Sequence, residues 1–324
     1  MRATFYEQQS ANRRLSILLM LSVALLLAAL GFSIGFAYTG NEFGGGAFTL
    51  GALVLGIVLS IGSYYGGDSI VLAASGATEA DPVRDQQLLN VVQEMAIAAG
   101  VPMPRVYLID DTAPNAFATG RDPEHASVAI TTGLLQKLDR EALQGVIAHE
   151  MGHVRNLDIR FMLLIGVLVG GIALLSDMFM RSMMFGGARR SRDRESGGGG
   201  LQAIMMVVAV VLAILAPIAA RLVQLSVSRQ REYLADATSV ELTRNPAGLE
   251  RALATIATDT EVLEVANRAT QHLYIVNPIK KMEARASGMF STHPPIADRI
   301  DRLRQLRAAS PLSTDERALL SGTE

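Results

Sequence analysis

The 324-residue chain contains no cysteine and no tryptophan. Without cysteine it can form no disulfide, and a zinc ion could be held only by His, Asp and Glu side chains. Charged residues are also scarce, at 19%, and the net charge of −2 gives no basic surface of the kind that binds nucleic acid. The composition therefore excludes disulfide-stabilised folds and cysteine zinc fingers, and we expect no nucleic-acid partner.

Apolar residues make up half of the chain and give a mean hydropathy of +0.29. They are concentrated in four blocks, each long enough to cross or nearly cross a bilayer as a helix. The blocks are Leu15–Ala37, Ala47–Tyr65, Phe161–Met180 and Leu201–Ala220. We therefore expect a mainly α-helical membrane protein whose four hydrophobic helices form two hairpins, with a soluble part in addition.

The first pair of blocks predicts a transmembrane hairpin. Arg13 and Arg14 precede it, which keeps the N-terminus in the cytoplasm, and the linker "YTGNEFGGG" has no Lys or Arg. A cleaved signal peptide is the competing interpretation, but its apolar region is only about 7–15 residues long. We expect the chain to return to the cytoplasm by about Gly66. The predicted location is the plasma or inner membrane, with the soluble part facing the cytoplasm.

The second pair of blocks allows two arrangements. The connecting loop, residues 181–200, is rich in glycine and holds five arginines, which resist translocation. The pair either crosses the membrane or packs in or against its cytoplasmic side. Both arrangements leave residues 81–160 and 221–324 on the same side, so these segments can build one site together.

The soluble segments predict a small α+β domain. Asp81 and Pro82 are expected to begin a helix that ends at Gly100, and Asp139 to cap the next helix. Runs rich in β-branched and aromatic residues predict a small sheet from 105–110, 115–120 and 126–135. The expected order is an N-terminal transmembrane hairpin (1–80), the first part of the soluble domain (81–160), the second hydrophobic hairpin (161–220) and the second part of the domain (221–324).

The segment "AHEMGHVRN", residues 148–156, carries the strongest chemical pattern. His149 and His153 lie about 6 Å apart along a helix axis and roughly 40° apart around it. Two imidazoles so placed can bind one zinc ion, and Glu150 is then placed to act as a general base. The competing interpretation is a solvated helix turn. The flanking residues are too polar for the middle of a bilayer, which argues against a site inside the membrane.

A catalytic zinc needs a third protein ligand, and Glu232 in "SRQREYLAD" is the best-placed acid. Asp236 lies one helical turn further on, where it could orient a ligand histidine. The alternative is a helix beside the membrane with exposed charges and with Arg229 and Arg231 facing lipid headgroups. Spacing alone leaves both interpretations open.

The motifs "HEMGH", "SRQREYLAD", "PNAFATG" and "STHPP" occur here in the same order as in the HtpX-type membrane zinc metalloproteases, relatives of the CAAX prenyl proteases. The chain resembles that family over nearly its whole length. The resemblance implies a zincin-like domain with one zinc ion per chain, bound by His149, His153 and Glu232. It also implies that Glu150 is the base and that Asp236 supports a ligand from behind.

Two further roles rest on the same resemblance. His293, in "STHPP", is the first choice for stabilising the oxyanion, although a histidine before Pro-Pro is more often structural. Asn115, Ala116 and Phe117 are expected to bind substrate, as an exposed edge strand that pairs with an extended peptide. The alternative for them is an ordinary sheet strand that ends at Gly120.

The expected function is that of a membrane-bound zinc endopeptidase that cleaves misfolded or damaged membrane proteins, with protein substrates and the lipid bilayer as its partners. A CAAX-type processing protease is the alternative within the enzymes. A membrane scaffold or chaperone with a structural zinc would need a fourth protein ligand, and none is evident. A transporter is disfavoured because Asp177 is the single charged residue in the four blocks.

Overall fold

The computed structural model of the chain describes residues 5–186, 199–261, 263, 274–275, 294–307 and 316–317. The chain divides into two compact units. Unit 1 comprises Met1–Ser63 and Leu164–Gln224, and unit 2 comprises Tyr64–Leu163 and Leu225–Glu324. Three helices, α2, α6 and α7, run from one unit into the other.

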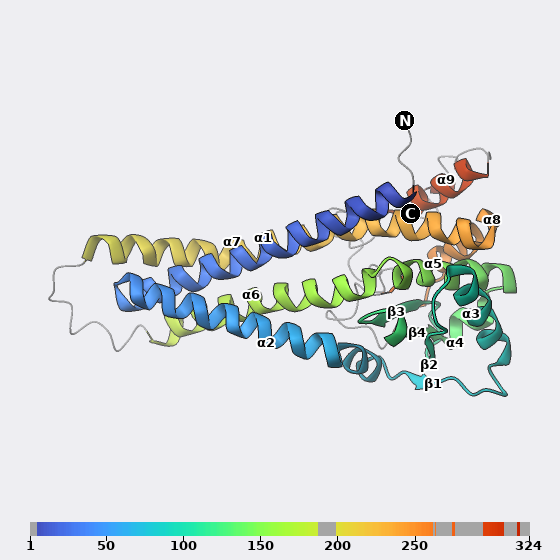
Figure 1. Cartoon of the computed structure of the whole chain (residues 1–324), viewed down its shortest axis with the longest axis horizontal. Helices are drawn as coiled ribbons and strands as arrows, with labels where there is room; N and C mark the ends of the chain where they lie inside the picture. Colours follow the sequence, from blue (N-terminus) through green and yellow to red (C-terminus); the bar gives the residue numbers. More distant parts are fainter. Residues whose placement is uncertain are drawn as a thin grey trace. The chain divides into compact units, whose positions relative to one another are not determined.

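The described residues of unit 1 are helical except for Gly40 and Asn41, which join α1 to α2 (Figure 1). Unit 1 contains α1, the first part of α2, most of α6 and the first part of α7. Their bounds are Phe5–Thr39, Glu42–Ala74, Asp158–Gly186 and Gly199–Thr243. Each of these helices is long and apolar enough to cross a membrane. The predicted set of four hydrophobic helices is therefore confirmed.

Small residues let α1 and α2 approach closely. Gly40, with φ of +74°, ends α1, and the Asn41 side chain accepts a hydrogen bond from the Gly44 N–H at the start of α2. A Cβ atom on Gly35 would lie 2.5 Å from the Gly44 carbonyl oxygen. Gly31 lies one turn earlier on the same face, and a Cβ atom there would lie 3.0 Å from the Ala52 Cβ atom of α2. This is the packing by which membrane helices bring their backbones together.

Unit 2 contains a mixed sheet of four strands in the order β1-β2-β4-β3. The strands are Thr78–Glu79, Arg105–Ile109, Ala126–Thr131 and Ala116–Gly120 in that order. The β2–β4 pair is parallel, whereas β1–β2 and β3–β4 are antiparallel. The strand predicted over residues 126–135 is shorter in the structure and ends at Thr131. The Thr131 side chain caps the helix α4 (Thr132–Lys137), which contains residues 132–135.

Besides its parts of α2, α6 and α7, the described part of unit 2 contains α3 (Gln86–Ala99), a short 3-10 helix η1 (Pro123–His125), α4, α5 (Arg140–Arg155), α8 (Pro246–Thr258) and α9 (Ile296–Leu306). Asp139 caps α5 through the Ala142 N–H, as predicted. The predicted start of α3 was wrong. Asp81 instead accepts hydrogen bonds from Val83 and Arg84 in a separate turn, and α3 begins afterwards.

The sheet of unit 2 lies between two apolar layers. On one side the residues of α3, α5, α8 and α9 form the main core with alternate residues of the strands. On the other side Phe117 packs in a smaller cluster with Leu72, Ile109 and Tyr274. Figure 1 shows α3, α4 and α5 gathered beside the strands, and α5 contacts β3 directly. The helix with the histidine pair is thus held by the core and the sheet.

Two glycines of α5 let other helices reach its backbone. A Cβ atom on Gly145 would lie 2.6 Å from the Leu249 nitrogen of α8. Gly152 lies between the two motif histidines in the sequence. A Cβ atom on it would lie 3.2 Å from the Ala235 Cα atom of α7. The Ser239 hydroxyl of α7 also donates to the Gly145 carbonyl at 2.8 Å. These contacts fix α7 and α8 against α5.

Changing Gly145 to Ala should destabilise unit 2 by roughly 1–3 kcal/mol, because the added methyl group meets backbone atoms that cannot move aside. Thermal unfolding in detergent measures the effect. Gly66→Ala is the matched control, since Gly66 is a helical glycine of unit 2 with open space around it. Equal unfolding midpoints for the two variants would contradict the close α5–α8 contact at Gly145.

Candidate metal centre

The two motif histidines point their Nε2 atoms at each other from one face of α5. The Nε2 atoms are 3.2 Å apart. His149 is completely buried, and the His153 side chain is 15% exposed. The core that packs around α5 holds both rings in place, so that the two Nε2 atoms, once unprotonated, can share one ion.

Glu232 of α7 completes a group of three ligand atoms, which all lie within 4.8 Å of one another. Its carboxylate oxygens lie 3.7 Å from His149 Nε2 and 3.5 Å from His153 Nε2. A tetrahedral ion with bonds of about 2.0–2.2 Å places its ligand atoms roughly 3.3–3.6 Å apart. The observed separations of 3.2–3.7 Å, with one Glu232 oxygen nearer to each histidine, are close to that range, so the side chains present can hold one metal ion.

The charges around the two histidines also call for a cation. Six charged residues, each at most 5% exposed, surround them. They are the carboxylates Glu150, Asp158, Glu232 and Asp236 and the guanidinium groups of Arg231 and Arg299. With all six ionised, two negative charges are left without compensation in a buried site, which is costly. A divalent cation balances them.

The pKa values of the histidines reflect these neighbours. Burial lowers the pKa of His149 below its ordinary value, although its hydrogen bond to Asp236 opposes the shift. Burial would also lower the pKa of His153. The carboxylates of Asp158 and Glu232 outweigh that effect and raise the pKa of His153 well above its ordinary value. In the absence of metal, a proton on His153 therefore supplies part of the missing positive charge.

Glu150 lies beside the group and is 1% exposed, and neither carboxylate oxygen has a hydrogen bond of ordinary geometry to the described residues. Burial raises the pKa of Glu150 to about 7, and the positive charge of His153 works against this shift. The N–H group of Ala118 in β3 is near enough to favour the charged form as well. A buried carboxylate with unused oxygens and a pKa near neutrality can accept and release a proton.

A carboxylate contacts the Nδ1 atom of each histidine, the ring nitrogen that does not face the metal group. Asp236 Oδ1 lies 3.0 Å from His149 Nδ1, where the sequence placed it as a supporting residue. Asp158 Oδ2 lies 3.1 Å from His153 Nδ1, and sequence reasoning did not assign it. Such contacts fix the orientation and tautomer of ligand histidines. Asp158 is in reach because Leu157, with φ of +59°, turns the chain between α5 and α6.

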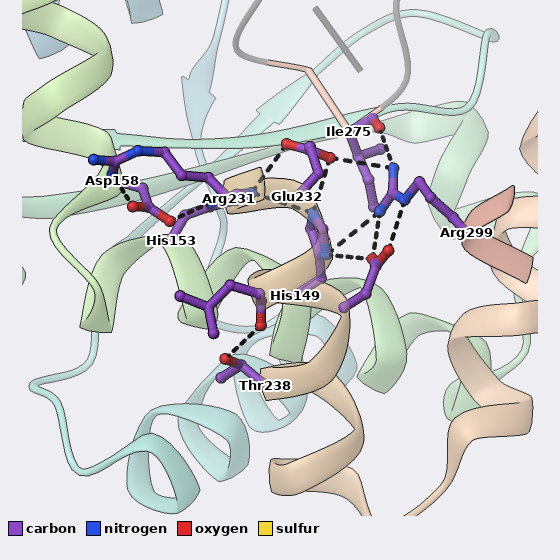
Figure 2. Close-up of polar contacts among 10 residues, drawn as sticks. His149, His153, Asp158, Arg231, Glu232, Thr238, Ile275 and Arg299 are labelled. Atoms are coloured by element: carbon purple, nitrogen blue, oxygen red, sulfur yellow. Dashed lines mark hydrogen bonds and ion pairs between the residues drawn. The ribbon is translucent and has the colours of Figure 1, made fainter. Parts of the chain in front are cut away.

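Two buried arginines in turn pair with these carboxylates (Figure 2). Arg231 pairs with Asp158 and lies over the Phe161 ring, 4.1 Å from its centre. Arg299 of α9 contacts both Asp236 and Glu232. The alternative in which Arg231 faces lipid headgroups is wrong, since this side chain is buried at the site. Sequence reasoning missed Arg299, and no local motif marks it.

The predicted substrate strand is an edge strand, but it is not exposed. Asn115, Ala116 and Phe117 are at most 4% exposed, so the expectation of an exposed strand was wrong. The Ala116 carbonyl accepts a hydrogen bond from the Ile275 N–H at 2.8 Å, and the Phe117 ring packs edge-on against Tyr274. Residues 274–275 therefore occupy the edge at which a peptide was expected to pair.

His293, the predicted oxyanion stabiliser, lies outside the described residues. Its role stays a prediction from the sequence. Of the predicted site residues within the described part of the chain, the structure brings together His149, Glu150, His153 and Glu232, with Asp236 directly behind His149.

Comparison with known proteins gives a consistent result. The model of peptidase family M48 matches residues 82–307. Protease HtpX homolog of Caldanaerobacter subterraneus subsp. tengcongensis is 44% identical over 305 residues, which cover 94% of this chain and 98% of that protein. Protease HtpX homolog of Lactiplantibacillus plantarum is 45% identical over 302 residues, 93% of this chain and 99% of that protein.

Among solved structures, the crystal structure of S. mikatae Ste24p is similar, with a TM-score of 0.48 and 19% identity. The alignment covers 78% of this chain and 57% of Ste24p, so the chain spans little more than half the length of that protein. The family match includes every residue of the metal group. With its four apolar helices the chain is a multi-pass membrane metalloprotease, and it belongs to peptidase family M48.

Proposed function

We propose that the protein is a zinc-dependent endopeptidase of the plasma or inner membrane that hydrolyses peptide bonds in misfolded or damaged membrane proteins. The observation that carries the proposal is the convergence of His149, His153 and Glu232 at tetrahedral spacing, with the buried Glu150 carboxylate beside them. Among the residues that the structure describes, three protein ligands meet here, which leaves a fourth position for water or substrate, as a catalytic site requires. A structural zinc would use four.

Zinc is the metal that this donor set favours. Two imidazole nitrogens and one carboxylate oxygen suit zinc in a tetrahedral site, whereas magnesium and calcium prefer oxygen ligands in larger numbers. The carboxylates behind the histidines keep the Nδ1 atoms protonated and leave the Nε2 atoms as ligands.

The chemistry of hydrolysis divides between the ion and the protein. A bound zinc ion acidifies water and polarises the carbonyl of the peptide bond. Glu150 takes the proton from the attacking water on a carboxylate oxygen and then passes it to the leaving amine. Its burial keeps bulk water away from that proton, and the absence of ordinary hydrogen bonds leaves its oxygens available.

Membrane proteins are the proposed substrates because the site is built on helices that continue into apolar segments. Asp158, which holds His153, is the first residue of α6, and Glu232 belongs to α7. The site is thereby tethered to the membrane-spanning part of the chain. We propose that the soluble part faces the cytoplasm, as the arginines before the first span indicate.

The experiment is cleavage by the full chain purified in detergent. Protein stripped with a chelator should be inactive, and added zinc should restore cleavage of casein and of a destabilised membrane protein. Cleavage of prenylated CAAX peptides alone would establish the processing alternative. Stoichiometric zinc without cleavage of any of these substrates would establish the scaffold alternative.

Glu150→Gln should retain zinc and lose activity by roughly 10²–10⁴-fold, because the amide keeps the shape of the side chain but cannot accept a proton. Zinc content by elemental analysis and the rate of casein cleavage are measured on the same preparation. Ordinary activity in this variant would remove Glu150 from the role of base. Loss of zinc would show that Glu150 holds the ion itself.

Glu232→Ala should lower zinc affinity the most, since a ligand is lost, and Asp236→Ala should weaken it by roughly 10–100-fold. Glu241→Ala is the control on the same helix. Glu241 forms a half-exposed ion pair with Arg155 at 3.4 Å, a contact of little energetic weight. Competition for zinc against a chelating dye gives the ranking. Should Glu241 matter more than Glu232, the third ligand is misassigned.

A further inference from the structure

Arg299 is the largest completely buried side chain among the described residues. Its guanidinium group forms a bidentate pair with Asp236, with Nε 2.9 Å from Oδ2 and Nη2 2.7 Å from Oδ1. Nη1 donates to the Ile275 carbonyl at 3.0 Å and lies 3.2 Å from Glu232 Oε2 (Figure 2). One side chain thus contacts a ligand carboxylate and the carboxylate that supports a ligand histidine.

These contacts determine which ring nitrogen of His149 carries the proton and which one faces the other ligands. Asp236 Oδ1 lies near both Arg299 Nη2 and His149 Nδ1. An ionised carboxylate only accepts hydrogen bonds, so the 3.0 Å contact with Asp236 requires a proton on Nδ1. Arg299 Nη2 lies farther from Nδ1, at 3.5 Å, and donates to Asp236. The Nε2 atom of His149 is then unprotonated and faces His153 and Glu232. The two contacts from Arg299 hold the Asp236 carboxylate in place for this task.

We propose that Arg299 is a positioning residue of the metal group: it orients Glu232 and Asp236 together, so that the ligand atoms converge before an ion binds. The inference rests on the proposed metal role of His149, His153 and Glu232. A guanidinium group suits this role because its planar fork can bind one carboxylate with two nitrogens while the third reaches another.

A purely electrostatic role for Arg299 predicts the opposite effect on metal binding. The guanidinium group is a positive charge beside the ligand Glu232, and like charges repel. Removing it would therefore tighten binding of a divalent cation if charge alone mattered. Positioning predicts weaker binding, because the two carboxylates lose their common partner. The sign of the change distinguishes the two roles.

The test compares Arg299→Gln and Arg299→Lys with the wild type as full chains in detergent. Zn²⁺ affinity is measured by competition with a chelating dye, and Co²⁺ is used as a spectroscopic probe of coordination. We expect both variants to bind Zn²⁺ roughly 10–100-fold more weakly. We also expect weaker visible absorption from Co²⁺, since a loosened Glu232 lets the ion depart from four-coordinate geometry.

Arg304→Gln is the matched control. Arg304 lies on the same helix, α9, and pairs with Glu250 at 2.8 Å, away from the metal group. The control should keep the wild-type Zn²⁺ affinity and Co²⁺ spectrum. If Arg299→Gln does not fold, Arg299→Lys carries the test, because it retains a positive charge opposite the buried carboxylates but cannot form the fork.

Unchanged or tighter Zn²⁺ binding in folded Arg299 variants would overturn the inference. An equal loss of affinity in Arg304→Gln would overturn it too, since the effect would then come from the docking of α9. Failure of the proposed function would give a different set of Zn²⁺ binding results from failure of this inference. In that case the wild type takes up no stoichiometric Zn²⁺, or Glu232→Ala leaves the affinity unchanged.

Discussion

Charge compensation in a buried space is the constraint on which the rest of unit 2 depends. Four carboxylates and two guanidinium groups surround His149 and His153 with little exposure to water. Every one of these charges needs a partner, because an unpaired buried charge would cost more free energy than a single domain can spare. The pairs Asp236–Arg299 and Asp158–Arg231 satisfy part of the requirement. A bound divalent cation would satisfy the remainder.

The fold supplies those partners from segments that are far apart in the sequence. The histidines come from α5, the third ligand from α7 and one arginine from α9. Glycines at 145 and 152 bring the backbones of α7 and α8 close to α5. The edge strand β3 lies against the same helix, so that Ala118 approaches Glu150. Ile275 links β3 to α9, because its N–H group donates to the Ala116 carbonyl of β3 and its own carbonyl accepts from Arg299 of α9.

The sequence predicted those features that depend on local periodicity. Helical spacing places His149 and His153 on one face, length and hydropathy identify the four apolar helices, and Asp139 marks the start of α5. Glu232 was only the best of several acids by spacing, since a third ligand comes from another element and its distance is set by tertiary packing.

What the sequence could not predict is the outer layer of the site. Arg231 lies inside the motif "SRQREYLAD", but the pattern does not name its partner. Asp158 and Arg299 belong to none of the quoted motifs. Each of the three is recognised only through its partner in space. The burial of β3 was missed for a similar reason. Its edge is covered by Tyr274 and Ile275, more than 150 residues later in the chain, and a strand pattern cannot show which segment lies against it.

X-ray absorption of the zinc-loaded protein tests the central claim most directly, because it reports the atoms around the ion. Two imidazole rings and a shell of nitrogen and oxygen atoms at about 2.0–2.2 Å are the expected result for a four-coordinate ion held by His149, His153 and Glu232. A single imidazole, or a six-coordinate shell of oxygen atoms, would contradict the site described above.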